Sequence, residues 1–155
     1  MDNPSPLPPD QPTSGQENLI GQVRVLQESD DLEGVLALLK EKEQICRESG
    51  NRDSLKECLK SRGDLLSDRL DWTGAIEAYK AAEQICRDLD DFSRLWAVLN
   101  NQGNAFRRSG DLDRALHLYQ EQEQICRQSN IPDGLRMSLG SQALILKNRG
   151  ELVCL

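Results

Sequence analysis

Three cysteines recur at a constant spacing, and their thiols are the first groups in the sequence that could do chemistry. Cys46, Cys86 and Cys126 each follow the string EQI, and 40 residues separate one from the next. Thiolates can bind zinc or form disulfides, but no pair among the five cysteines has the spacing of a zinc or redox motif. Each of the three lies on the apolar stripe of an amphipathic segment. We therefore expect reduced thiols packed in a core, with Cys154 as the most reactive one.

The single histidine could serve a catalytic triad, but the sequence around it does not support one. His117 lies beside Leu116 and Leu118, and no serine or cysteine is placed to complete a triad. The sequence also has no glycine-rich phosphate loop and no cluster of metal ligands. We expect His117 to be a surface residue, and we expect a chain that is not an enzyme and that needs no cofactor.

Three neighbouring asparagines, Asn100, Asn101 and Asn104, give the strongest functional signal. An amide side chain offers a donor and an acceptor together, so one asparagine can pair with both the N–H and the C=O of a peptide. Such a group could hold an extended peptide through its backbone. The alternative is a polar helix surface without a ligand. If Asn101 and Asn104 are exposed, removing their amides should change stability by less than about 0.5 kcal/mol.

Positive charge accompanies the asparagines. Arg107 and Arg108 end the same segment, Lys147 corresponds to Arg107 in the next unit, and Lys60 corresponds to Asn100 in the previous one. These side chains could attract an acidic segment even though the net charge of the chain is -7. The same negative charge disfavours nucleic acid and anionic membrane surfaces as partners. No apolar run is long enough to span a bilayer, and the N-terminus has no basic segment leading into an apolar one. With the expected reduced thiols, this leads us to expect a cytoplasmic protein.

The elements that position these residues follow from an internal repeat. Comparing the sequence with itself at an offset of 40 residues aligns apolar and small positions along most of the chain. Corresponding sets include Leu59, Leu99 and Leu139; Leu39, Tyr79 and Tyr119; Gly63, Gly103 and Ala143. Two apolar stripes of helical period per unit predict helices at 17–28, 31–48, 53–68, 71–88, 92–108, 111–128 and 132–148. Gly103 is expected to let two helix backbones approach closely.

Glutamate and arginine also recur with the repeat, four residues apart in each unit. The pairs are Glu43–Arg47, Glu83–Arg87 and Glu123–Arg127. This spacing and order predict ion pairs within a helix, each contributing about 0.2–0.5 kcal/mol. We expect them on a solvated face.

The pattern Leu99, Gly103, Phe106, Gly110-Asp111, Ala115 and Tyr119 resembles the tetratricopeptide repeat. The 40-residue period is longer than the usual period of about 34 residues, and is similar to that of kinesin light chains and of the Leu-Gly-Asn repeat adaptors. The resemblance implies an all-α, right-handed α-solenoid of antiparallel helix pairs, with about three and a half repeats. It also implies that the helices at 53–68, 92–108 and 132–148 line a concave groove.

Two regions are predicted. Residues 1–16 hold five of the six prolines and form a disordered tail, and residues 17–155 form the repeat array with a truncated last repeat. The truncated end is expected to expose Leu144, Ile145, Val153 and Leu155 and could support self-association.

The predicted function is a non-catalytic interaction module, an adaptor or scaffold that binds a protein or peptide partner in the groove. The alternatives are a structural or self-associating segment of a larger signalling protein, or the regulatory arm of a signalling ATPase.

Overall fold

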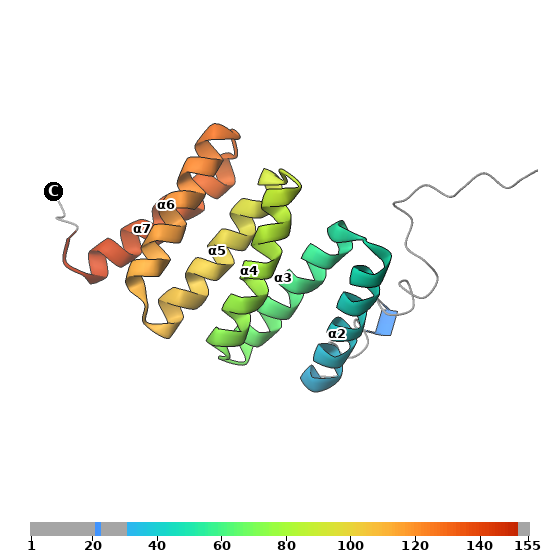
Figure 1. Ribbon diagram of the computed structural model, residues 1–155. Coiled ribbons are helices and arrows are strands. Elements are labelled where there is room, and N and C mark those ends of the chain that lie inside the picture. The colour runs from blue at the N-terminus through green and yellow to red at the C-terminus, as the bar shows by residue number, and fades with distance from the viewer. Residues whose placement is uncertain (1–20, 23–30, 152–155) are drawn as a thin grey trace, which may run out of the picture.

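The computed structural model describes residues 21–22 and 31–151, and within this part the chain is helical without any strand. Its helices lie side by side in a row, with α2 at one end and α7 at the other (Figure 1). They are α2 (Leu32–Ser49), α3 (Arg52–Asp68), α4 (Trp72–Asp88), α5 (Phe92–Ser109), α6 (Leu112–Gln128) and α7 (Pro132–Asn148). The all-α prediction is confirmed, and each predicted helix end from residue 31 onward lies within one residue of the observed end.

Two predictions fall wholly or mostly outside the described residues. These are the tail at 1–16 and the helix at 17–28, of which only the helical residues Gly21 and Gln22 are described. None of the described helices is long and apolar enough to cross a membrane.

Side chains at the helix starts explain why the boundaries were predictable. Five helices begin after an aspartate or asparagine whose oxygen accepts the backbone N–H three residues later, at 3.0–3.1 Å. These caps are Asp31, Asn51, Asp71, Asp91 and Asp111. Such a cap satisfies an amide that has no partner inside the helix, and replacing it by alanine typically costs about 1 kcal/mol. Helix α7 lacks a side-chain cap and begins at Pro132 instead.

The turns between helices require a left-handed backbone. Gly110 adopts φ 96° after α5, and Leu70 adopts φ 64° at the corresponding position after α3. A side chain in this conformation is strained by roughly 1–2 kcal/mol, which glycine avoids. The left-handed turn after these helices is therefore kept even where leucine replaces glycine, and it ends both helices within one residue of corresponding positions.

Packing along the row is local. Each helix from α2 to α7 packs on its described neighbours along the chain. In addition the backbones of α3 and α5, and those of α5 and α7, lie close together, whereas α4 and α6 meet only through side chains, as in the Arg87–Glu121 ion pair. The row is therefore more closely packed along one side, which we call the α3–α5–α7 face. We call the opposite side, where α4 and α6 lie, the α4–α6 face.

Tyrosine rings fill the space between successive helices. A Cβ added to Gly103 would lie 2.7 Å from the Tyr119 ring, and one added to Gly63 would lie 2.5 Å from the Tyr79 ring. The close approach predicted at Gly103 is thus to a side chain of the following helix and not to its backbone. Tyr119 is fully buried, with Phe106, Ala115 and Ile145 in the same cluster.

The last helix differs from the prediction at one residue. Ile145 was expected to be exposed but is fully buried, because it faces Tyr119 and Phe106 of the preceding helices. Leu144 is 44% exposed, as predicted, and Leu139 is 43% exposed although its counterparts Leu59 and Leu99 are buried. No described helix follows α7 to cover Leu139. Val153, Cys154 and Leu155 lie outside the described residues.

Candidate functional site

Asp64 is the centre of a polar cluster that joins three helices. Its Oδ1 accepts hydrogen bonds from the Tyr79 hydroxyl of α4 at 2.7 Å and from the Asn101 amide of α5 at 2.9 Å. Its Oδ2 pairs with Lys60, one turn earlier on α3, at 2.7 Å. Two of the predicted site residues, Lys60 and Asn101, therefore meet on one carboxylate that was not among the predicted site residues.

The next unit repeats this arrangement without the charge. Asn104 corresponds to Asp64, and its Oδ1 accepts a hydrogen bond from the Tyr119 hydroxyl of α6 at 2.6 Å. Asn104 is therefore part of the packing between α5 and α6. The expectation of little stability loss assumed an exposed amide, whereas Asn104 is half-buried. We now expect its removal to cost more, because the buried Tyr119 hydroxyl would lose its acceptor.

Both tyrosines are held in the neutral form. Burial, followed by the hydrogen bond to the Asp64 carboxylate, raises the pKa of Tyr79 far above its ordinary value. Burial also raises the pKa of Tyr119, and Arg107 and Ser141 near its hydroxyl only partly offset this. These hydroxyls are donors that orient Asp64 and Asn104 and are not acid–base groups near neutral pH.

Asn100 does not reach the surface. Asn100 is only 5% exposed, so its side chain is buried, unlike those of its neighbours Asn101 and Asn104. An amide in this position cannot touch a partner in this conformation. We leave Asn100 out of the candidate surface for that reason.

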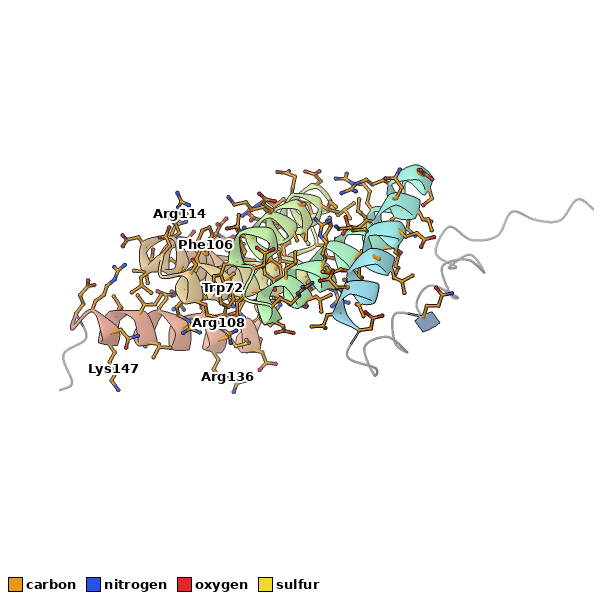
Figure 2. All side chains as sticks on the ribbon, turned by 90° about the horizontal axis from the view of Figure 1, so that it is seen from below. Trp72, Phe106, Arg108, Arg114, Arg136 and Lys147 are labelled. Carbon is orange, nitrogen blue, oxygen red and sulfur yellow. The ribbon has the colours of Figure 1, made fainter. Side chains whose placement is uncertain are left out.

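Three of the predicted cations, which lie on α5 and α7, have no carboxylate partner among the described residues. Arg107, Arg108 and Lys147 form no ion pair with any described residue, whereas Lys60 and many other cations do. Arg108 lies over the ring of Trp72, with its Cζ 5.8 Å from the ring centroid. Figure 2 shows Arg108, Arg136 and Lys147 along the same side of the row, with the side chains of Arg136 and Lys147 directed outward. The arrangement can attract negative charge and has no group poised for bond cleavage.

The predicted Glu–Arg pairs are present but are not all solvated. Glu83–Arg87 and Glu123–Arg127 pair at 2.7 and 2.8 Å. Glu43 is instead 1% exposed and pairs with Arg62 of α3 at 2.9 Å. Burial raises the pKa of Glu43, and the neighbouring arginines only partly offset this. Glu43 thus pairs both with Arg47 of its own helix at 3.5 Å and with Arg62 of the next helix, which corrects the expectation of a solvated face.

The thiols lie in the interior. Cys46, Cys58, Cys86 and Cys126 are buried and free. Burial raises the pKa of Cys58 to about 12 and that of Cys86 to about 11. Among the described residues, no three His, Cys, Asp or Glu side chains are grouped so that they could hold a metal ion. His117 is exposed, as expected from the sequence.

Comparison with known proteins adds no identity to this description. The chain matches no family model and no curated sequence.

Proposed function

We propose that the chain is a tetratricopeptide-like right-handed α-solenoid that acts as a non-catalytic adaptor or scaffold. In this proposal the α3–α5–α7 face is the concave groove, and it holds an acidic peptide or helix of a partner protein. The supporting observation is the set of cations on that side, Arg107, Arg108 and Lys147, that have no carboxylate partner among the described residues.

The excess of acidic residues gives meaning to the lack of ion pairs between these three cations and the described residues. The chain carries 26 acidic residues against 19 lysines and arginines, so an exposed cation has many carboxylates to choose from. Arg52 and Arg149 each pair across to another helix, and Arg114 and Arg136 pair within their own. Cations that remain unpaired in such a chain are available to an external carboxylate at no loss of an internal ion pair.

Polar groups beside these cations suit a peptide backbone. Asn101 uses its amide nitrogen on Asp64, and Asn104 uses its oxygen on Tyr119. The other amide atom of each remains available, one as an acceptor and one as a donor. Because their partners fix both side chains, a bound peptide would lose less free energy to ordering them. Cytoplasmic location belongs to the proposal too, since buried free thiols suit a reducing compartment.

The test compares charge reversals on and off the proposed groove. The probe is a fluorescent peptide of alternating glutamate and serine, titrated with the full chain and followed by anisotropy. We expect Arg108→Glu and Lys147→Glu each to raise the Kd about 3- to 10-fold, an effect that fades with added salt. Lys40→Glu on α2 is the control, because Lys40 is exposed and forms no ion pair with a described residue. Equal weakening by all three variants, or no binding of the probe, would remove the proposal.

A second candidate function is self-association. Helix α7 exposes Met137, Leu139 and Leu144 to 41%, 43% and 44%. Apolar side chains on the last described helix could pair two copies, as in a structural segment of a larger protein. Sedimentation velocity of the chain tests this: Leu139→Glu with Leu144→Glu should shift a dimer to monomer, whereas Leu89→Glu should not. A monomeric unmodified chain would exclude this second function.

A further inference from the structure

A cavity of about 300 Å³ opens on the α4–α6 face, away from the proposed groove. Its walls come from α5 and from α4 and α6, which are linked by the Arg87–Glu121 ion pair. The lining includes Lys80, Gln102, Phe106, Arg114, His117 and Leu118. In Figure 2, Arg114 and Phe106 lie on the side of the row opposite Arg136 and Lys147.

The buried lining residue Gln102 has an unused acceptor. Gln102 is 1% exposed, and its Oε1 has no hydrogen-bond partner among the residues that the structure describes. A buried carbonyl oxygen without a donor is unfavourable in a folded protein. A ligand that brings a hydrogen-bond donor to this oxygen would therefore gain free energy that a purely apolar ligand would not.

An aromatic ring and two cations form the outer part of the cavity. The Phe106 ring has Arg114 Cζ at 5.6 Å and Lys80 Nζ at 6.0 Å from its centroid. Lys80 forms no ion pair with any described residue, and Arg114 keeps only an exposed contact with Asp111 at 3.4 Å. The one carboxylate in the lining, Glu83, is paired with Arg87 at 2.7 Å. The rim is therefore positive, and both cations can face an aromatic ring.

These three features together define what fits. The cavity is at the lower end of the range of about 300–1,000 Å³ for small-ligand sites, so it suits a single side chain better than a large cofactor. Lysine or arginine would meet like charge at Lys80 and Arg114. Phenylalanine has the ring but no donor, and asparagine has the donor but no ring. Tyrosine has an apolar ring with an O–H donor at its tip, and its single ring is smaller than the indole of tryptophan, which also carries a donor.

We propose that this cavity binds a tyrosine side chain of a partner protein, flanked by acidic residues. The tyrosine hydroxyl donates to Gln102 Oε1, its ring packs on Phe106 and Leu118, and the flanking carboxylates face Lys80 and Arg114. The site is separate from the proposed groove and does not depend on it.

The experiment uses two capped peptides, Asp-Glu-Tyr-Glu-Asp and Asp-Glu-Phe-Glu-Asp, which differ only by the hydroxyl. Each is titrated into the isotopically labelled full chain and followed by NMR. We expect the tyrosine peptide to bind about 3- to 10-fold more tightly, which is the size of one neutral hydrogen bond. The amide signals that shift should belong to Lys80, Phe106 and Leu118, and not to Arg136 and Lys147.

A variant then locates the hydroxyl. Gln102→Met keeps the side-chain length and removes the amide, so both peptides should bind equally to it. Arg114→Ser should weaken both peptides to the same extent, whereas Arg127→Ser on the same helix should weaken neither. The peptide comparison on the unmodified chain stands even if Gln102→Met does not fold. Equal affinity of the two peptides, no saturable binding of either, or shifts confined to α7 would each overturn the proposal.

Discussion

At the scale of single residues, the corresponding positions Asp64 and Asn104 both accept a hydrogen bond from a buried tyrosine, although one is charged and the other is neutral. In one unit Lys60 and Asp64 form an ion pair beneath Tyr79, and in the next unit Asn100 and Asn104 occupy these two positions. The acceptor for the tyrosine hydroxyl is kept in both units. The hydrogen bond from tyrosine is therefore common to these two units, and the charge beside it differs between them.

This feature predicts how stability depends on alkaline pH. The chain has two tyrosines, and the pKa of each is raised in the folded state. In the unfolded state a tyrosine ionises near pH 10. Above that pH the unfolded chain loses protons that the folded chain keeps, so the free energy of unfolding should fall. The slope should approach about 1.4 kcal/mol per pH unit for each tyrosine. Urea unfolding between about pH 9 and 11 measures it, with tyrosinate absorbance as the readout.

Tyr79→Phe is the matched test of this assignment. It removes one of the two ionising tyrosines, so the alkaline slope should drop by the share of Tyr79 and keep the shares of Tyr119 and of the buried thiols, whose pKa values are also raised. It also removes the donor to Asp64, so stability at neutral pH should fall by about 1 kcal/mol. An unchanged slope in the variant would contradict the role given to Tyr79.

The residue scale is also where prediction from sequence was weakest. The i,i+4 pairs could be read from spacing, because a helix fixes which residues are neighbours. The partner of Asp64 could not, since Tyr79 lies 15 residues away and Asn101 lies 37 away. Those contacts, and the burial of Asn100, depend on how the helices are rotated against one another. The one available signal was the recurrence of tyrosine at Tyr79 and Tyr119 with a polar residue 15 positions before each.

At the scale of helices, most of the structure could be predicted. The repeat supplied the number of elements from residue 31 onward, and capping residues such as Asp71 and Asp111 supplied their starts. The positive φ of Leu70 could be suspected only by analogy with Gly110, since leucine itself disfavours that conformation. The burial of Ile145 could not be predicted from the stripe of α7 alone, because it depends on how α7 is rotated against Tyr119 of α6 and Phe106 of α5.

Two glycines in helices predict opposite effects of the same substitution. Gly103→Ala should gain helix propensity but force the Tyr119 ring away, because the new Cβ would lie 2.7 Å from it. The ring is buried and its hydroxyl is hydrogen-bonded to Asn104, so we expect a net loss of about 1–3 kcal/mol. Gly140→Ala in α7 meets nothing within 4 Å and should gain up to about 1 kcal/mol. Urea unfolding of both variants measures the two changes, and a stabilising Gly103→Ala would contradict the tight fit.

At the scale of the molecule, local packing predicts that the row can be extended. Because each helix packs on near neighbours, stability should grow with the number of units. A second copy of residues 72–111 inserted after Asp111 preserves the 40-residue offset and adds one α4–α5 unit. We expect a higher free energy of unfolding and a steeper dependence on urea concentration, since more surface is exposed on unfolding.

A linker of 40 glycines and serines inserted at the same point is the control. It adds the same length without an interface, so it should lower stability through the entropy of closing a long loop. Equal effects of the two insertions would show that the added unit does not pack.

The local packing also gives the row a mechanical character. Among the described helices α2 and α7 do not touch, so no contact ties one end of the row to the other. A force applied at the two ends is carried by the helix interfaces in series, and a small tilt at each lengthens the whole row. The molecule is then a soft spring. A stiff partner that binds several units at once would have to stretch or compress the row. Its affinity would fall as the spacing of its binding groups departs from the spacing of the units in the unstrained row.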